Sequence, residues 1–435
     1  MGILGRFFGR PSQERHTPTS SKVIRARFDA AESQDDRRHW ANADWLSLDG
    51  ALTPVVRRTL RNRARYERLN NSYLAGIAET LATDLIGTGP RLQMNAGDDE
   101  ADRVIERSFF DWACRIDLAG KLRTMRQSKL IDGEAFAMFI SNPRLPDVQL
   151  DLRLIEAEMV ATPIGMYVPI TTPEGSIVDG LEFDDVGNVI AYKVLKYHPG
   201  SNYRISNFEF NRIPAELMIH WFARQRPAQH RGVSEVAPAI RLFAQLRRYT
   251  DAVIAAAETA ADFAAFLHTN SPAAEVDDVD AFAEMPIEKR TMVTLPEGWD
   301  VSQLKAEQPT AQFGDFRRQI ISEIARCLQL PYNIAALDSS SYNYASGRMD
   351  HQIYAATQRV HRDEIDRLVL DRLLHAWLDE AVPLGIVPRG LPPITEWNWT
   401  WVWDGKEHVD PGKEAEAART RLETHTTTLA HEYAK

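Results

Sequence analysis

Apolar residues recur every three or four positions along much of the chain, and this period predicts helices. Thr53-Pro54 is typical of a helix start, with Thr as the N-cap and Pro at the first helical position. A second helix is expected to end at Gly87. A third helical pattern begins after Gly232 and continues into the alanine-dense stretch Ala255–Ala265, where small side chains let a neighbouring helix approach closely.

The second half of the chain carries two more helical patterns with a hydroxyl-rich stretch between them. Helical period returns from Phe316 to Leu328 and ends before Pro331. Residues 337–347 then include four serines and two tyrosines, and we expect a loop there. Arg348–Glu380 follows as one uninterrupted helix, which would span roughly 50 Å. A helix this long indicates an elongated subunit or a repeat array, and no internal repeat is present.

Between about Ile131 and Phe222 the pattern changes to short runs that are typical of strands. Turn residues from Asp184 to Asn188 indicate a hairpin between two of these runs. We therefore predict an α+β fold. The expected strands are Ala135–Ile140, Leu150–Val160, Ile177–Phe183, Val189–Tyr197 and Leu217–Phe222.

Four tryptophans near the C-terminus alternate at period two: Trp397, Trp399, Trp401 and Trp403. This period places all four on one face of a strand. We interpret that face as one packed into a core. A platform on which bases or sugars stack is the alternative.

Composition favours a folded chain of two or three domains. The chain has 435 residues, of which 44% are hydrophobic, and a domain takes roughly 150 residues. The net charge of −10 excludes a chain-wide basic coat that holds nucleic acid by neutralising phosphates. Residues 1–70 nevertheless carry 14 basic and 8 acidic side chains. The basic end and the acidic remainder are therefore expected to face different partners.

A stripe of arginines lies on the first helix at spacings of 4, 4 and 3 residues: Arg57, Arg61, Arg65 and Arg68. One interpretation is a face for nucleic acid or an acidic partner. The other, which we favour, is a solvated face that forms salt bridges between subunits, because charged runs usually lie on an exposed helix face.

Cysteine usage and the N-terminus exclude several classes of protein. Cys114 and Cys327 are far apart and have no Cys/His cluster near them, so neither a disulfide framework nor a cysteine zinc site is expected. The first residues show no secretion signal, and Arg6 stands where myristoylation requires Ser or Thr. The most apolar long run, Ala252–Leu267, is interrupted by two acidic residues, so we expect no membrane span.

Each catalytic signature fails on a residue that its mechanism requires. His361-Arg362-Asp363 mimics a kinase catalytic loop, but Leu368 stands where the metal-binding Asn belongs. No phosphate-binding loop, G-x-S-x-G elbow or H-E-x-x-H zinc motif occurs. The carboxylates of Asp98-Asp99-Glu100 and of Asp277, Asp278 and Asp280 are interpreted as solvated loops. We therefore expect no catalytic residue, no metal and no cofactor.

Short stretches in a fixed order carry a resemblance over most of the chain. In the first third they are Arg27–Ala31, Arg37–Ala41, Arg57–Glu67, Asn70–Tyr73 and Gly87–Gln93. Later ones are Asp132-Gly133-Glu134, Ile219–Phe222, Arg226–Gln229, Arg231–Ser234 and Tyr342–Ser346. Together they resemble the lambda-type family of tailed-phage portal proteins, the head-tail connectors.

The resemblance implies a portal fold and a ring, typically of twelve subunits, at one vertex of the capsid. Through this ring the terminase pumps DNA in, and the DNA later leaves. The implied parts are an N-terminal arm (1–34), the wing (35–233), two stem helices (234–262 and 312–330), the clip between them (263–311), a tunnel loop (331–347), a long wing helix with a closing strand (348–404) and a short helical crown (405–435).

The resemblance also implies sites and partners. The DNA-facing tunnel loop would present Ser339, Ser340, Ser341, Tyr342, Asn343, Tyr344, Ser346 and Arg348. The clip that docks terminase and adaptor would use Glu275, Asp277, Asp278, Asp280 and Glu284. Expected partners are other copies of the chain, double-stranded DNA without sequence preference, the terminase large subunit, the major capsid or scaffold protein and the head-tail adaptor. The protein would be made in the host cytoplasm and reside in the virion.

Two alternatives remain open from the residues. In a metal-dependent phage DNA-processing enzyme, the acidic clusters would bind metal. A non-ring structural adaptor would show neither rings nor DNA cleavage.

Overall fold

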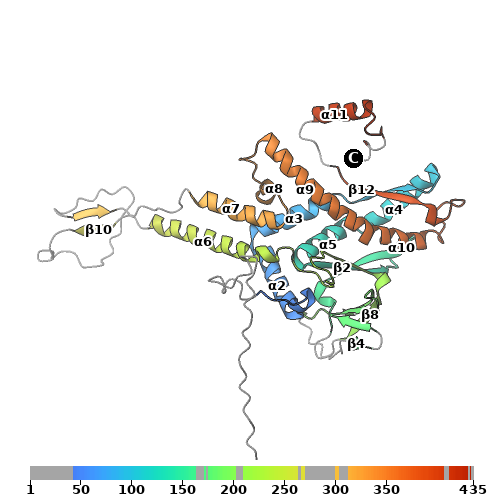
Figure 1. Ribbon diagram of the computed structural model, residues 1–435, viewed down its shortest axis with the longest axis horizontal. Coiled ribbons are helices and arrows are strands. Elements are labelled where there is room, and N and C mark those ends of the chain that lie inside the picture. Colours follow the sequence, from blue (N-terminus) through green and yellow to red (C-terminus); the bar gives the residue numbers. More distant parts are fainter. Residues whose placement is uncertain are drawn as a thin grey trace, which may run out of the picture. The chain divides into compact units, whose positions relative to one another are not determined.

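The computed structural model describes residues 43–162, 171–172, 175–201, 209–262, 266–269, 299–302, 312–405, 411–429 and 432. The chain divides into two compact units, Met1–Ser47 and Leu48–Lys435. In the first unit, the backbone N–H of Leu46 donates to Asp44 over 3.0 Å. All elements below belong to the second unit (Figure 1).

Among the described residues of that unit, more lie in helices than in strands. The first half holds α1 (Leu48–Ala51), α2 (Pro54–Asn70), α3 (Ser72–Ile86), α4 (Asp99–Arg115), α5 (Leu118–Asp132) and α6 (Ile240–Asp262). The second half holds α7 (Gln312–Cys327), α8 (Tyr332–Ala336), α9 (Tyr344–Ile365), α10 (Asp371–Ala381) and α11 (Pro411–Glu423). Short 3₁₀ turns are η3 (Ala157–Met159), η4 (Ala215–Leu217), η5 (Ala237–Ala239) and η7 (Ile394–Glu396).

The strands in the described part of the chain form four antiparallel sheets. A three-stranded sheet has the order β3-β2-β9, from Leu150–Ile155, Glu134–Ser141 and Met218–Phe222. A five-stranded sheet runs β4 to β8 in chain order, from Thr171–Thr172, Gly175–Val178, Leu181–Phe183, Val189–Leu195 and Phe210–Pro214. Two-stranded sheets join β1 (Arg91–Asn95) to β12 (Asn398–Val402) and β10 (Phe266–Thr269) to β11 (Trp299–Ser302). The mixture of helices and sheets confirms the α+β prediction.

The three-stranded sheet is the middle layer of the body, because alternate side chains of β2 enter different cores. Ala135 and Ala137 face a core formed with helices α4, α5 and α10. Phe136, between them, enters a second core with the five-stranded sheet. Period-two alternation thus places helices on one face and a second sheet on the other.

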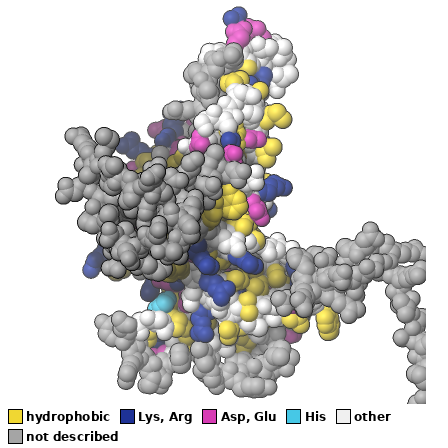
Figure 2. Space-filling view, turned by 90° about the vertical axis from the view of Figure 1, so that its left-hand side faces the viewer, with side chains coloured by type: hydrophobic (Ala, Val, Ile, Leu, Met, Phe, Trp, Pro, Cys, Tyr) yellow, Lys and Arg dark blue, Asp and Glu magenta, His cyan; other side chains and the backbone are white. Residues whose placement is uncertain are grey.

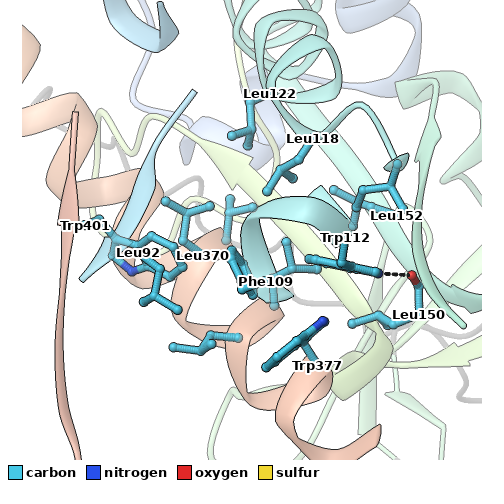
Figure 3. Close-up of a cluster of buried hydrophobic side chains, with 14 of the residues drawn as sticks. Leu92, Phe109, Trp112, Leu118, Leu122, Leu150, Leu152, Leu370, Trp377 and Trp401 are labelled. Carbon is cyan, nitrogen blue, oxygen red and sulfur yellow. Dashed lines mark hydrogen bonds between the residues drawn. The ribbon is translucent and has the colours of Figure 1, made fainter. Parts of the chain in front are cut away.

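Aromatic packing dominates the helix-side core (Figure 3). Phe109 of α4 lies with its ring centroid 5.5 Å from that of Trp377 on α10 and 5.6 Å from that of Trp401 on β12. The indole N–H of Trp112 donates to the carbonyl of Leu150 over 2.9 Å, so this buried polar group is satisfied. Segments that are far apart in the sequence, such as α4 and β12, are therefore joined in one core.

The expected helix boundaries near the N-terminus are confirmed. The Thr53 hydroxyl accepts from the N–H of Val56, and Pro54 opens α2. α3 ends at Gly87, whose φ of +57° suits glycine. The hairpin turn at Asp184–Asn188 joins β6 to β7 as expected. The expected strand Ile177–Phe183 is wrong as one element, because a turn at Asp179 and Gly180, both with positive φ, separates β5 from β6.

Helices α6 and α7 lie side by side (Figure 1). Phe243 and Leu246 of α6 pack with Ile321 and Ile324 of α7 in a third core. Farther along, the Tyr249 ring of α6 lies 4.8 Å from that of Phe316. Along the chain, β10 and β11 lie between α6 and α7. The segment that contains them therefore begins and ends at the same pair of helices.

The prediction of one uninterrupted helix over Arg348–Glu380 needs correction. Helix α9 starts four residues earlier, at Tyr344, and the π-helical turn Asp366–Leu370 (η6) separates it from α10. A π turn accommodates one extra residue inside a helix. It lies where the helix enters the aromatic core, since Val369 and Leu370 are fully buried there.

The tryptophan face is packed inward, which confirms the core interpretation. Trp397 and Trp401 are buried and Trp399 and Trp403 partly so. The indoles of Trp399 and Trp401 both donate to Asp371 Oδ1 over 2.7 and 2.9 Å, and that of Trp403 donates to Asp366 over 3.0 Å. These bonds tie β12 to the helix beneath it.

Within the described residues, we find no helix both long and apolar enough to cross a membrane.

Candidate DNA-facing segment

The segment that the resemblance assigns to DNA lies between helices α7 and α9. Pro331 starts the short helix α8, and Leu337, with a φ of +50°, ends it. Residues 337–343, between α8 and α9, are irregular. Asp338 Oδ1 accepts from the backbone N–H of Ser340 over 2.9 Å, and the N–H of Tyr342 donates to the carbonyl of Ser339 over 3.0 Å. The loop is thus a sequence of hydrogen-bonded turns.

The loop expected over residues 337–347 is wrong in its last four residues, because α9 already begins at Tyr344. Asn343 caps this helix: its Oδ1 accepts from the N–H of Ser346 over 2.8 Å, while the Ser346 hydroxyl accepts from the N–H of Asn343 over 3.2 Å. This reciprocal pair is a capping box. A capping residue followed by a hydrogen-bonding side chain three positions later was the signal in the sequence that would have placed the helix start correctly.

Most of the proposed DNA-facing residues do reach the surface. Those exposed are Ser339, Ser340, Ser341, Asn343, Tyr344, Ser346 and Arg348. Tyr342 is partly buried, and burial together with a hydrogen bond to Asp350 raises the pKa of its hydroxyl. Hydrogen bonds from the Ser340 side chain and backbone lower the pKa of Asp338, which keeps it ionised. The segment therefore offers hydroxyls, the amide of Asn343, the carboxylate of Asp338 and the guanidinium of Arg348.

Two arginines on α7 border the loop, and sequence reasoning missed both. Arg318 donates to the hydroxyl of Ser341 and stands 4.9 Å over the ring of Tyr332. The charges of Arg318 and Arg317 also act on Asp338 and help to lower its pKa. Only folding brings these arginines to the loop, since Arg318 and Ser341 are 23 residues apart.

An open groove of about 650 Å³ lies beside this segment, between α7 and α9. Its polar wall contains Ser322 and Arg326 from α7, Gln329 from the turn after it, and Asp350 and Thr357 from α9. Cys327 also lines the groove, and burial together with the charge of Glu235 raises the pKa of its thiol, so the thiol stays protonated at neutral pH.

The acidic residues assigned to the clip lie outside the described residues: Glu275, Asp277, Asp278, Asp280 and Glu284. At either side of them along the chain, β10 and β11 pair antiparallel from Phe266 opposite Ser302 to Thr269 opposite Trp299.

Both interpretations of the arginine stripe are wrong for its first members. Arg57 and Arg61 are buried, and the ion pairs of the stripe lie within this chain. Arg57 pairs with Asp179, and Arg65 with Asp132 over 2.7 Å and with Glu158 over 2.9 Å. Arg68 pairs with Glu79 over 3.3 Å. The stripe holds α2 against the body of the protein instead of facing a partner.

At the centre lies the Glu134 cluster, which we define as Glu134, Arg61, His220 and Arg231. The fully buried Glu134 accepts from Arg231 at 2.6 and 2.9 Å, from Arg61 at 3.3 Å and from His220 at 3.2 Å. Burial alone would raise the pKa of Glu134, but the charge of Arg231 and the hydrogen bonds from His220 and Arg231 hold it well below its usual value. Burial lowers the pKa of His220, so it is neutral at neutral pH.

Two glycines let the segments of this cluster meet backbone to backbone. Gly133 has a φ of +92°, and a Cβ there would lie 2.3 Å from the carbonyl carbon of Val233. A Cβ on Gly232 would lie 2.1 Å from the Gly133 carbonyl oxygen. Two of the stretches that carry the family resemblance, 132–134 and 231–234, are therefore adjacent in the structure.

A metal site is poorly supported in the described part of the chain. Asp98 caps α4, with its carboxylate accepting from the N–H of Glu100. Glu156, Glu158 and His198 could in principle surround an ion. However, Arg65 already pairs with Glu158 at 2.9 Å and with Glu156 at 3.5 Å. A guanidinium thus supplies the positive charge that a metal would bring.

The kinase-like triplet His361-Arg362-Asp363 is structural. Arg362 donates to the carbonyls of Leu85 and Asp84, and Asp363 pairs with Arg367 on the same helix.

Comparisons with known proteins agree on one family. Residues 33–362 match the family model described as phage portal protein, lambda family. The chain is 26% identical over 406 residues to a protein of Halomonas phage phiHAP-1 named "Probable portal protein", covering 86% of this chain and 76% of that protein.

Solved structures show weaker likeness. A chain from the neck of an empty gene transfer agent particle, computed with C6 symmetry, is 14% identical with a TM-score of 0.45, covering 84% of this chain and 88% of that chain. The HK97 family phage portal protein from Corynebacterium diphtheriae is 11% identical with a TM-score of 0.32, covering 81% and 98%.

Proposed function

Since this chain belongs to the lambda family of phage portal proteins, we propose that it assembles into a ring at one vertex of the capsid and forms the channel for DNA. The observation that carries the proposal is the family match over residues 33–362, which includes most of the described helices and strands. Twelve subunits are the number we propose. Head-to-tail contacts that close by rotation produce such rings.

The parts of the subunit follow the order of the chain. We assign the arm to residues 1–34, the wing to 35–233, and the stem to 234–262 and 312–330. The clip is 263–311, the tunnel loop 331–347, the long helix with its closing strand 348–404, and the crown 405–435. The side-by-side packing of α6 and α7 supports the stem assignment, because a stem needs two helices that leave and return together.

The chemistry of the loop supports a role next to sliding DNA. A channel must let many base pairs pass, and dense Lys/Arg contacts would hold the phosphates. Residues 339–346 offer hydroxyls and amides instead. Such groups position the DNA backbone without reading sequence. Arg317, Arg318 and Arg348 supply a limited positive charge beside them.

The acidic clip residues Asp277, Asp278 and Asp280 are proposed to meet basic surfaces of the terminase and later of the head-tail adaptor. The capsid or scaffold protein would contact the wing. The assembled protein would reside in the virion after synthesis in the host cytoplasm. We propose no nuclease or ATPase activity for the chain itself.

Light scattering and negative-stain microscopy of the purified full chain test the ring. We expect closed rings with one dominant subunit number. A chain that stays monomeric at all accessible concentrations and salts would show that the assembly proposal is wrong.

Particle assays test the loop. Replacing Ser340 and Ser341 by Asp places negative charge where phosphates would pass, so particles should lose packaged DNA while rings still form. Thr400→Asp, on the exposed face of β12, is the matched control and should leave DNA retention unchanged. Normal retention by the double Asp variant would contradict the DNA-facing assignment.

A further inference from the structure

The outer edge of strand β12 has no partner strand in the described part of the chain, because β12 pairs only with β1 there. On β1, the backbone N–H of Met94 donates to Glu106 of α4 over 2.8 Å, so Met94 does not exchange hydrogen bonds with Trp399 opposite it. Hydrogen-bonded and non-hydrogen-bonded pairs alternate in an antiparallel ladder. Leu92 and Trp401 therefore do not exchange them either. The backbone groups of Trp399 and Trp401 thus point away from β1, toward the open edge.

The opposite edge of this two-stranded sheet is closed by side chains. The N–H of Met94 donates to Glu106 and that of Ala96 to Asp102, each over 2.8 Å. An open edge, in contrast, is a template on which another extended chain can pair. Of the two edges of this sheet, that of β12 is therefore the one available to a further strand.

A groove of about 380 Å³ lies at this open edge. Its lining consists of the five consecutive residues 397–401 together with Asp366 and Asp371. Side chains of consecutive strand residues point to opposite faces, so the backbone edge is what these five residues share. We call this feature the β12 groove.

The two carboxylates of the β12 groove lack a cationic partner. Indole N–H groups of the tryptophan face donate to both, but neither forms an ion pair with a Lys or Arg among the described residues. Burial, together with the charges of Asp371 and Asp363, raises the pKa of Asp366 to about 7. A cation placed beside this pair would relieve the repulsion and favour the ionised form.

The nearest arginines are already engaged. Arg362 lowers the pKa of Asp366 without restoring its usual value, and it donates to the carbonyl of Leu85. Arg367 pairs with Asp363. Elsewhere acidic and basic side chains lie next to one another, as on the face shown in Figure 2. The β12 groove therefore combines an open strand edge with a negative charge that a partner can neutralise.

The N-terminal arm contains a segment with the matching pattern. Residues 22–28, which lie outside the described part of the chain, include three basic residues and no acidic one. From residue 24 on, apolar and basic side chains alternate in the order Ile24, Arg25, Ala26, Arg27, Phe28. In an extended chain this period places both guanidinium groups on one face, about 7 Å apart.

We propose that residues 22–28 of one subunit pair, as an added strand, with the open edge of β12 of a neighbouring subunit. Arg25 and Arg27 then face the two carboxylates of the β12 groove. In strand addition, backbone hydrogen bonds supply affinity and side chains in flanking pockets supply specificity. This proposal rests on the proposed ring, which brings a neighbour beside every subunit.

The connecting chain is long enough for this exchange. Residues 29–47 join the segment to helix α1. At about 3.3 Å per residue they span up to about 63 Å. The 23-residue helix α6, at 1.5 Å per residue, is about 35 Å long. The arm can therefore extend beyond its own subunit.

Cysteine cross-linking tests the contact. Because Thr400 pairs with Gln93 at a hydrogen-bonded position of β1, it faces the added strand at a non-hydrogen-bonded one. Opposite Cα atoms are there about 4.5 Å apart, which a disulfide can bridge. Ala26→Cys and Thr400→Cys are made in separate full-length chains that also carry Cys114→Ser and Cys327→Ser.

The two chains are co-expressed, allowed to assemble and oxidised. We expect a cross-linked dimer from the pair and none from either variant alone. Ile24→Cys and Phe28→Cys, each paired with Thr400→Cys, cover a register shifted by two residues. Ala26→Cys paired with Val186→Cys, at a hairpin position that is 86% exposed, is the matched control and should not cross-link.

Charge reversal tests the ionic part. Arg25→Glu with Arg27→Glu should slow cross-linking at low salt at least tenfold, after correction for the reactivity of the thiol toward a monofunctional maleimide. Arg37→Glu with Arg38→Glu makes the same charge change in the same half of the chain outside the segment, and should leave the rate unchanged.

The outcomes separate this contact from the ring itself. Rings that give no cross-link from any of the three arm positions overturn the strand addition. Equal rates for the parent and the Arg25→Glu, Arg27→Glu variant overturn the pairing with the carboxylates. A chain that never associates overturns both this proposal and the proposed ring.

Discussion

Helices α2 and α10 are stabilised in opposite ways. Helix α10 buries Leu373, Leu374 and Trp377 in the aromatic core, as its apolar period predicts. Helix α2 buries Arg57 and Arg61 and leaves Val55 and Leu69 in water. The first is held by apolar burial, which needs no particular partner, and the second by ion pairs, which need every partner in place. The helical period therefore indicates a buried face in both helices, but it does not indicate whether apolar or charged side chains lie on that face.

We expect the largest effect from removing the buried carboxylate that pairs with the arginines of this region. Glu134→Ala leaves Arg61 and Arg231 buried without their shared carboxylate. Removing one partner of a buried ion pair costs about 3–5 kcal/mol. We expect the free energy of unfolding in urea to fall by that amount.

The carboxamide variant Glu134→Gln, which keeps the size and one acceptor, is the control and should lose less. An Ala variant as stable as the parent would show that the Glu134 cluster does not hold α2 in place.

The next largest effect is expected from a cavity in the apolar core around α10. Leu373→Ala in α10 should lower the free energy of unfolding by about 2–5 kcal/mol, since the fully buried side chain leaves a cavity. The loss should be the same at low and high salt. Leu384→Ala, at a position 54% exposed, is the control and should change stability by less than about 0.5 kcal/mol.

A smaller effect distinguishes the two regions by pH. Burial, together with the charges of Asp371 and Asp363, raises the pKa of Asp366 to about 7. Its folded pKa lies above its unfolded value, so the folded state binds more protons and stability falls as pH rises from about 4 to about 7. The pKa of Glu134 is shifted the opposite way, so its contribution is lost only in acid.

Asp366→Asn keeps an oxygen that can accept from Trp403 but removes the titration. Thermal melts between pH 4 and pH 8 should therefore be flatter for this variant, and its melting temperature at pH 8 should exceed that of the parent. An unchanged pH profile would assign the slope to another group.

The smallest effect concerns an ion pair in water. Arg367 and Asp363 pair on the surface of the long helix, with 67% and 64% of their side chains exposed. Exposed pairs of this spacing contribute about 0.3–0.5 kcal/mol. Arg367→Ala should therefore be nearly silent in urea unfolding. A loss near that of Glu134→Ala would contradict the distinction between buried and exposed ion pairs.

Much of the fold could be predicted where one stretch of sequence contains the whole signal. The Thr53-Pro54 start, the turn at Asp184–Asn188 and the inward face of the tryptophans each depend on neighbouring residues. The environment of α2 could not be predicted, because Arg61 bonds to Glu134, which lies 73 positions later in the sequence. A run of arginines looks the same from the sequence whether it faces water or buried carboxylates.

The candidate site divides in the same way. The hydroxyl-rich composition of residues 339–346 located the exposed segment, but the helix start at Tyr344 depends on a hydrogen-bond pair between Asn343 and Ser346 that composition does not reveal. Arg317 and Arg318 reach Asp338 only through the packing of α7 against α8.

The π turn at Asp366–Leu370 fixes the phase between the two parts of the long helix. One residue of an α-helix corresponds to a rotation of about 100°, so the extra residue accommodated there turns everything beyond it by about that angle. Before the turn, Tyr354 and Gln358 point inward; after it, Leu373 and Trp377 do. A chain one residue shorter in this stretch could continue as regular α-helix. The exposed side chains of Met349–Val360 and the buried side chains of Leu373–Trp377 could then no longer both point as they do. The one extra residue therefore sets the angle between the exposed side of α9 and the buried side of α10.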